Sequence, residues 1–294
     1  MIQVDENLEM LNNEIGAMIK RNLYKNREIK CCPHCGCKNY MKYGKYKGIQ
    51  RFKCKNNECT KTFSQTTKSV WSYSKKNAKK WIEFIELMME KRTLKYCAKK
   101  LEISIVTAFY WRHKVLNSMI NDFENVKLLE NVQFGKSVMK ENFKGCRNIE
   151  TSEREDIWIV AASGINDVLL SLPICKRTWN LKKFEEKIYS KVERQSYITS
   201  YGDRYLQLVA NNHNKELEKI EVKADERIKY LRRNLNEWML CFCGIGTKYL
   251  RQYLSWFILF FIDKTINYMT IVTNLMKENS FFKNYDIKNL GEYI

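Results

Sequence analysis

The chain has 294 residues, of which 45% are hydrophobic and 13% aromatic, and this composition excludes a disordered protein and allows two or three compact units. Its 52 Lys and Arg residues outnumber its 33 Asp and Glu residues by 19, and most of this excess lies before residue 122. Such a charge favours a polyanion, above all nucleic acid, as partner; the plainer alternative is a solvated lysine-rich surface.

The 11 cysteines accompany an N-terminal stretch that lacks the apolar core of an export signal, and residues 1–29 are predicted to form a helical segment. We therefore expect reduced thiols in a cytoplasmic, nucleoid-associated protein rather than a disulfide scaffold. The most apolar stretch, Tyr253 to Ile262, is about ten residues long, whereas a membrane-spanning helix needs about 20. We expect a buried helix there and no membrane partner.

The first predicted domain is a zinc ribbon over residues 30–66. Cys32 and Cys35 form a CxxC pair, and Cys54 and Cys59 form a second pair further along the chain. Four thiolates that converge on one zinc ion leave no open position for water. The spacing of the two pairs therefore predicts a structural zinc site rather than a catalytic one.

The segment between the two pairs favours a β-hairpin, because Gly44 and Gly48 suit turns and Gln50 to Lys53 has the pattern of a strand. Phe63 follows the last cysteine and is predicted to cover the small core. Three neighbouring side chains leave the ligand set open, because each could replace one of the four thiols: Cys31, His34 and Cys37.

Residues 75–121 are predicted to form a helix-turn-helix that binds DNA. Apolar residues recur every three or four positions from Trp81 to Met88, and Thr93 and Ser104 are placed to cap two further helices. The second helix of such a motif enters the major groove with its first residues toward the bases. A plain helical hairpin is the alternative. The residues assigned to the DNA contact are Thr107 and Arg112 for bases, Lys114 for phosphate, and His113 between them.

Together these motifs resemble the zinc-ribbon insertion-sequence transposases of the ISXO-two-like type, over residues 30 to about 257. Each motif alone is weak, but their combination in this order is specific. The matching segments are Cys32-Pro33-His34-Cys35, Arg51-Phe52-Lys53-Cys54, Lys61-Thr62-Phe63, Trp81 to Trp111, Phe143-Lys144-Gly145, Glu237-Trp238-Met239, Gly244 to Leu250, Tyr253-Leu254 and Trp256.

The resemblance implies an RNase H-like α/β domain with a mixed sheet over residues 126–257, and hence a mixed α+β chain; the tail over residues 258–294 carries no motif. In this family acidic residues hold two divalent ions such as Mg²⁺, which drive strand cleavage and joining. The pattern of the chain fits that skeleton. It predicts a strand hairpin over Ile157–Ala162 and Asp167–Ile174, a helix over Leu181–Glu193, a strand over Ser196–Ser200 and a helix over Ala224–Leu240.

The positions that match the family's acids carry no carboxylate in this sequence. Gly135, followed by Lys136, stands at the first position, Tyr201 at the second, and Lys229 at the third. Glycine offers no side-chain ligand, tyrosine is protonated at neutral pH, and lysine repels a divalent ion. Asp203 is the best acid to replace the missing ones. Further acids near these positions are Glu130, Asp156, Asp225 and Glu226.

Three hypotheses about function follow. The first is a transposase-like protein that binds double-stranded DNA at element ends through the ribbon and the helix-turn-helix, as a monomer or a homo-oligomer, without cutting it. The second is an active Mg²⁺-dependent transposase that uses displaced acids such as Asp203. The third is a zinc-ribbon transcription regulator.

Overall fold

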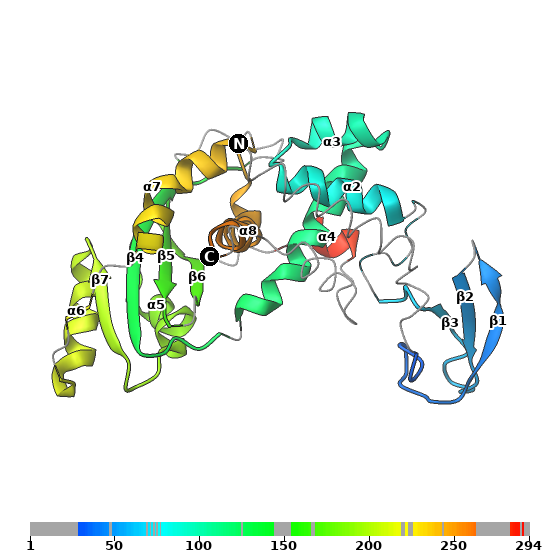
Figure 1. The fold of residues 1–294 in the computed structure, drawn as a ribbon, viewed down its shortest axis with the longest axis horizontal. Helices are drawn as coiled ribbons and strands as arrows, with labels where there is room; N and C mark the ends of the chain where they lie inside the picture. Colours follow the sequence, from blue (N-terminus) through cyan, green and yellow to red (C-terminus); the bar gives the residue numbers. More distant parts are fainter. Residues whose placement is uncertain are drawn as a thin grey trace, which may run out of the picture. The chain divides into compact units, whose positions relative to one another are not determined.

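The chain divides into two compact units in the computed structural model (Figure 1). The first includes residues up to Glu90 together with Leu94–Ser118, and the second includes Lys91–Thr93 and Met119–Ile266. The predicted helical segment over 1–29, apart from residue 29, and most of the tail over 258–294 lie outside the described residues. The structure describes residues 29–46, 49–68, 70, 72, 74, 76, 78–124, 126–143, 154–165, 168–218, 221–222, 226–242, 244–262, 283–288 and 290.

The first unit begins with a three-stranded antiparallel sheet in the order β1-β2-β3, called the ribbon below. Its small core is a cluster of three rings, Tyr40, Phe52 and Phe63, whose centroids lie 5.5 to 5.8 Å apart. Phe63 is only 3% exposed, which confirms that it covers this core. The strands are β1 (Tyr40–Tyr46), β2 (Ile49–Cys54) and β3 (Thr62–Ser64).

Three helices complete the described part of the first unit. Trp81 stacks on Trp111 with ring centroids 4.0 Å apart, and Phe84 meets the edge of the same ring. The Ser104 hydroxyl accepts a hydrogen bond from the amide of Thr107, so the predicted cap of the last helix is confirmed. The helices are α2 (Ala78–Met89), α3 (Leu94–Leu101) and α4 (Ile105–Glu124), whose last residues belong to the second unit.

The second unit is built on a four-stranded mixed sheet in the order β6-β5-β4-β7. β4, β5 and β6 are antiparallel neighbours, whereas β7 pairs with β4 in parallel. The mixed sheet expected from the sequence is therefore present. β5 is one residue longer at each end than predicted, whereas β6 and β7 begin and end two residues and one residue later than predicted. They are β4 (Asn131–Lys140), β5 (Asp156–Ser163), β6 (Leu169–Lys176) and β7 (Tyr197–Tyr201).

Helices follow β6 and β7 along the chain. The helix predicted over Leu181–Glu193 ends early, because the backbone of the buried Ile188 leaves the helical region and a short 3-10 turn, η2 (Tyr189–Lys191), follows. The helix predicted from Ala224 is described only from Glu226 onward. The remaining elements are α5 (Leu181–Lys187), α6 (Arg204–His213), η3 (Asn214–Glu216), α7 (Glu226–Leu240), η4 (Thr247–Tyr249), α8 (Leu250–Ile262) and α10 (Asn284–Lys288).

Alternation along β4 separates the two faces of this sheet. Phe134 points into a core that includes Phe184 of α5 and Leu206 of α6. The next residue, Gly135, faces the other way, toward Ile228 of α7. Successive side chains of β4 after Gly135 therefore lie alternately on the side of α5 and α6 and on the side of α7.

Two segments that are distant in sequence meet in the second unit: the residue before Phe143, and the segment from Gly244 to Leu250. The Asn142 amide donates to the Thr247 hydroxyl oxygen at 2.8 Å, and the Thr247 amide donates to the Asn142 carbonyl oxygen at 2.8 Å. Gly244 has a positive φ of 89°, and a Cβ there would lie 2.8 Å from the side-chain Nδ2 of Asn142. The backbone conformation therefore favours glycine at this position.

Helix α8 contains the most apolar stretch of the chain. Leu254 and Trp256 are each 0% exposed, so this stretch is a buried helix as expected. None of the described helices combines the length and the apolar character needed to cross a membrane.

Candidate functional site

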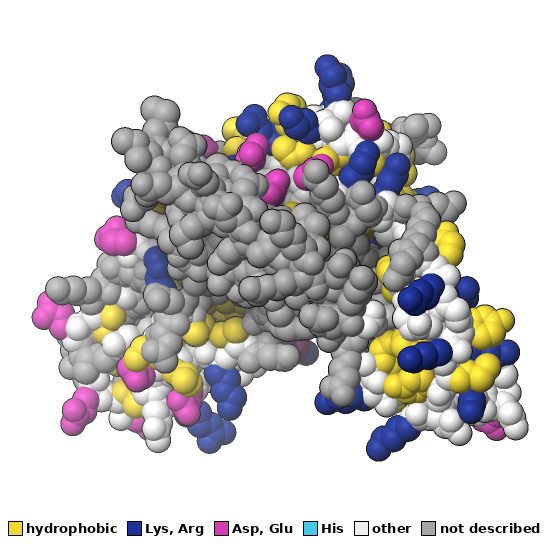
Figure 2. All heavy atoms as spheres, turned by 45° about the vertical axis from the view of Figure 1, so that its right-hand side comes forward, with side chains coloured by type: hydrophobic (Ala, Val, Ile, Leu, Met, Phe, Trp, Pro, Cys, Tyr) yellow, Lys and Arg dark blue, Asp and Glu magenta, His cyan; other side chains and the backbone are white. Residues whose placement is uncertain are grey.

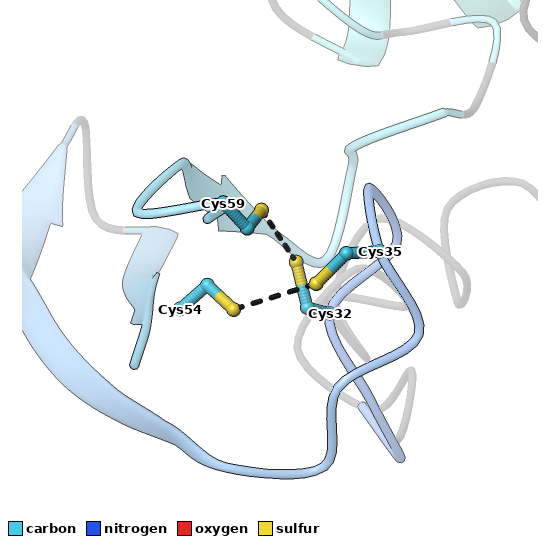
Figure 3. A group of neighbouring side chains, drawn as sticks. All are labelled: Cys32, Cys35, Cys54 and Cys59. Carbon is cyan, nitrogen blue, oxygen red and sulfur yellow. Dashed lines mark hydrogen bonds between the residues drawn. The ribbon is translucent and has the colours of Figure 1, made fainter. Parts of the chain in front are cut away.

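The ribbon brings four thiols together (Figure 3). Cys32 and Cys35 lie in the turn before β1, Cys54 ends β2, and Cys59 lies in the turn before β3. The Cys32 and Cys59 sulfurs are 3.9 Å apart, those of Cys35 and Cys54 are 3.6 Å apart, and all four lie within 4.8 Å of one another. Sulfurs bound at about 2.3 Å to one tetrahedral ion lie roughly 3.8 Å apart. The four thiols are therefore close enough to hold a single metal ion.

Backbone geometry and amide donors support this cluster. Gly36 adopts a φ of +76°, which allows its amide to donate to the Cys32 carbonyl oxygen and close the first turn. The Asn56 amide donates to the Cys54 sulfur at 3.4 Å. A hydrogen bond from the Cys37 backbone lowers the pKa of Cys35 to about 7, whereas burial raises the pKa of Cys54 to about 12. Amide donors of this kind stabilise thiolates and orient them toward an ion.

The alternative ligands do not join the cluster. Among the residues that the structure describes, the group that could hold a metal ion consists of the four predicted cysteines alone. Burial and the charge of Lys61 lower the pKa of His34, which lies outside this group. Cys31 and Cys37 are half-buried neighbours of the pair on the first turn.

Helix α4 does not present the side chains that were assigned to bases. Arg112 and His113 are each only 2% exposed, and Arg112 Nη2 lies 4.0 Å from the sulfur of Cys97. This burial counts against a contact of Arg112 and His113 with DNA bases, because none of the α4 residues after Thr107 whose burial is described is exposed. Lys114 is half-buried, and burial lowers its pKa. Thr107 is half-buried, and its hydroxyl contacts that of Ser104.

The exposed surface of these helices lies elsewhere. Ile105 and Val106, at the first turn of α4, are 52% and 58% exposed. α3 buries Cys97, Ala98 and Leu101 and exposes three lysines on its other side, which the Leu-Lys-Tyr-Cys-Ala-Lys-Lys-Leu pattern could have indicated. The three lysines are Lys95, Lys99 and Lys100.

In the second unit, the positions matched to the family's acids converge. Gly135 on β4 and Tyr201 on β7 are register partners across the parallel strands. Arg232 of α7 spans the same two strands, because its Nε donates to the Lys136 carbonyl oxygen at 3.0 Å and its Nη1 to the Tyr201 carbonyl oxygen at 3.2 Å. A guanidinium group therefore occupies the place where the resemblance puts carboxylates and metal ions.

Two glycines make room for this guanidinium. A Cβ on Gly135 would lie 2.5 Å from Ile228 Cγ2 and 3.1 Å from Arg232 Cδ. A Cβ on Gly202 would lie 3.2 Å from Arg232 Nη1, and Gly202 also has a φ of +64°. The helix α7 can approach the sheet this closely only because both positions lack a side chain.

Lys136 and Asp203 form a buried ion pair beside this point. Lys136 Nζ lies 2.9 Å from Asp203 Oδ2, and their side chains are 6% and 17% exposed. The ammonium group also lies 4.0 Å from the ring centroid of Trp179 and 4.4 Å from that of Trp158. Such a cage of rings stabilises a cation that has left water.

Both carboxylate oxygens of Asp203 are already engaged. Its Oδ1 accepts hydrogen bonds from the amides of Tyr205 and Leu206 at 3.0 Å each, so that it caps α6. Its Oδ2 faces Lys136. The carboxylate is therefore engaged as a helix cap and as a counter-charge, which counts against its use as a replacement catalytic acid.

Lys229 supplies no carboxylate, and the remaining acids near these positions do not form a carboxylate site either. Hydrogen bonds to Glu226 and to Tyr201 raise the pKa of Lys229. Asp156 pairs with Lys140 at 2.7 Å, Glu130 is exposed on a bend, and Asp225 lies outside the described residues. No group of three carboxylates comes together in the described part of the chain.

An open pocket of about 620 Å³ lies at these strand ends. Its cationic residues outnumber its one carboxylate, Asp203, which is already paired. The charged residues that line it are Lys136, Asp203, Lys229, Arg232 and Arg233.

No family model, curated protein or solved structure matches the chain, so these comparisons assign it to no family.

Proposed function

We propose that this chain is a transposase-like protein that binds double-stranded DNA and does not cut it. The observation that carries the proposal is Arg232, which bridges β4 and β7 at the point where Gly135 meets Tyr201. Two divalent ions beside a phosphodiester need converging carboxylates. A fixed cation at that point opposes them, because like charges repel strongly in a partly buried site.

The arrangement of elements supports the transposase-like part of the proposal. A strand hairpin (β5 and β6), a helix (α5) and a further strand (β7) follow one another in the order that the resemblance implies. The contact between Asn142 and Thr247 joins the residue before one of its motifs, Phe143-Lys144-Gly145, to a residue within another, Gly244 to Leu250. The RNase H-like description of this domain stays part of the proposal.

The ribbon supports DNA binding through the face of its sheet that is turned away from the aromatic core. Register pairs Met41 with Lys53 on this outer face. Tyr43 lies there too, beneath the cations of Arg51 and Lys53 at 5.8 and 5.5 Å from its ring centroid. Figure 2 shows basic and hydrophobic side chains intermingled at the right of the view, where the ribbon lies. Cations between exposed aromatic rings favour contact with phosphates and bases.

The helices supply a second basic surface. Lys95, Lys99 and Lys100 of α3 are exposed, and the apolar Ile105 and Val106 open α4 beside the turn that joins the two helices. In a helix-turn-helix these first residues of the second helix face the groove. This surface replaces Arg112 and His113 in the proposed DNA contact.

Zinc is the proposed metal of the thiol cluster. Four thiolates in tetrahedral reach form a closed structural site, and zinc binding of this kind contributes on the order of 10–16 kcal/mol to folding. We expect one zinc ion per chain by metal analysis. Cys54→Ser should lose it, whereas the matched control Cys241→Ser, an exposed thiol outside the cluster, should keep it. Full zinc content in Cys54→Ser would contradict the assignment.

The function as a whole is tested with labelled duplexes that carry the terminal repeats of the element, with Mg²⁺ or Mn²⁺ present. We expect binding that weakens about 10³- to 10⁵-fold between 50 and 200 mM salt if six to ten phosphates are contacted, and no cut strand. Nicked or joined strands that require the metal would overturn the proposal in favour of an active transposase. Selective binding to a promoter site, with no preference for element ends, would favour the regulator instead.

A further inference from the structure

The cations around the strand-end pocket lie on one stripe of α7. Lys229, Arg232, Arg233 and Asn236 are spaced by three and four residues, so they share one side of the helix. All four line the pocket together with Ser137 of β4. Each offers hydrogen-bond donors, and three of the four are cationic at neutral pH. The pocket is thus a concave surface rich in donors and in positive charge.

Arg232 is oriented before any ligand arrives. Two of its five N–H groups are used by the carbonyl oxygens of Lys136 and Tyr201. These bonds fix the plane of the guanidinium group against Gly202 and leave further N–H donors on its two terminal nitrogens. An arginine held in this way binds a tetrahedral oxyanion with little loss of side-chain freedom.

The neighbours of Arg232 determine what kind of anion fits. Arg233 and Asn236 are exposed at the mouth of the pocket, and Lys229 is half-exposed beside Tyr201. The one carboxylate in the lining, Asp203, is neutralised by Lys136. Lys229 is paired with the exposed Glu226, so the excess positive charge comes from Arg232 and Arg233. This excess selects an anionic group, and the size of the pocket admits a phosphate that is joined to sugars on either side.

We propose that this pocket binds a phosphate group of a nucleic-acid strand directly through Arg232, Arg233 and Lys229, without a metal ion. Naming nucleic acid as the source of the phosphate rests on the proposed function; the presence of an anion site does not. The chain would then hold DNA at the sheet as well as at the ribbon and the helices, with side-chain cations in the role that metal ions have in a cleaving enzyme.

The experiment compares the full chain with a Lys229→Gln/Arg233→Gln variant, because both side chains lie at the rim and neither holds the strands together. Arg194→Gln, an exposed arginine of the same unit outside the pocket, is the matched control. The probes are inorganic phosphate and a labelled DNA duplex, both in buffer without divalent cations. The readouts are the NMR signal of Arg232 Nε–H during phosphate titration and the DNA affinity as a function of salt.

We expect phosphate to shift the Arg232 signal in the full chain and in Arg194→Gln, and to leave it unchanged in the double variant. DNA affinity of the double variant should fall roughly tenfold or more, and its salt slope should decrease by about one, because one neutralised phosphate is lost. Phosphate shifts together with unchanged DNA affinity would keep the anion site but overturn nucleic acid as its ligand. An Arg232 signal that phosphate never moves would overturn the site itself, whether or not the chain binds DNA elsewhere.

Discussion

Gly135 and Tyr201 are register partners on the parallel strands β4 and β7, and the guanidinium group of Arg232 crosses the point where they meet. The position that the resemblance assigns to a carboxylate is thus not an empty cavity. Side chains of α7 have packed into it, which has consequences for stability as well as for chemistry.

Gly135→Ala should destabilise the second unit, because the new Cβ would lie 2.5 Å from Ile228 Cγ2. Overpacking of this kind costs about 1–3 kcal/mol, and Gly135→Asp should cost more. Urea unfolding measures the change. Gly164→Ala is the control, since its Cβ would meet neighbours no closer than 3.4 Å, and it should change the free energy of unfolding little. An alanine at position 135 without any loss of stability would mean that α7 does not lie this close to β4.

The ion pair of Lys136 and Asp203 should respond unequally to removal of either partner. Asp203→Asn leaves the ammonium group buried without a counter-charge, and it should cost about 3 kcal/mol. Lys136→Met keeps an apolar side chain among the tryptophan rings and leaves Asp203 with its two amide donors, so it should cost about 1 kcal/mol.

A double-mutant cycle separates this pair from its surroundings. Asp203→Asn should be much less harmful when Lys136 is already Met, because no charge is then left unpaired. Equal costs for Asp203→Asn in both backgrounds would show that the two groups do not interact. Such a result would also mean that Lys136 does not engage Asp203, so that Asp203 could have another role, including the catalytic one considered from the sequence.

The pH dependence of stability should show the contribution of Glu155. Hydrogen bonding to Lys176 and the charge of Arg177 lower the pKa of Glu155 below its ordinary value of 4.5. A depressed folded-state pKa contributes stability that is present above pH 4.5 and is lost as the pH falls through the folded-state value. Glu155→Gln should therefore flatten the stability curve below pH 4.5.

Thermal unfolding from pH 3 to pH 6 measures this curve. The control is Glu185→Gln, an exposed side chain on α5, which should leave the shape of the curve as in the original chain. If Glu155→Gln and the original chain lose stability in parallel below pH 4.5, the ion pairs of Glu155 with Lys176 and Arg177 contribute nothing to folding.

Features encoded locally could be predicted from the sequence. The two cysteine pairs, the strand ending at Cys54 and the cap at Ser104 depend on residues close in the chain, and the structure brings them into the expected geometry. The positions matched to the first two acids, Gly135 and Tyr201, are neighbours in the sheet, although no register between their strands was predicted.

Features that depend on long-range packing could not be predicted in this way. Arg112 follows Trp111 on the helix that was assigned to the DNA groove, and only the tertiary structure shows that both are buried. The bridge made by Arg232 requires α7 to lie on β4 and β7, which no local pattern specifies. The glycines at 135 and 202 were the only signal of that close approach, and glycine alone does not say what fills the space.

Substitutions of Arg112 and Lys99 compare the two proposed DNA contacts of the helices, one through α4 and one through the exposed lysines of α3. Lys99→Gln removes an exposed cation from α3, so DNA affinity should fall severalfold and the salt slope should decrease by about one, while the melting temperature stays unchanged. Arg112→Ala removes a side chain that is 2% exposed, so it should lower the melting temperature and leave base preference unaltered in the protein that stays folded. Binding to a set of duplexes with single base changes, measured alongside thermal unfolding, separates the two effects. A folded Arg112→Ala variant with an altered base preference would restore Arg112 to the DNA contact, because a buried residue that only packs cannot change which base is favoured.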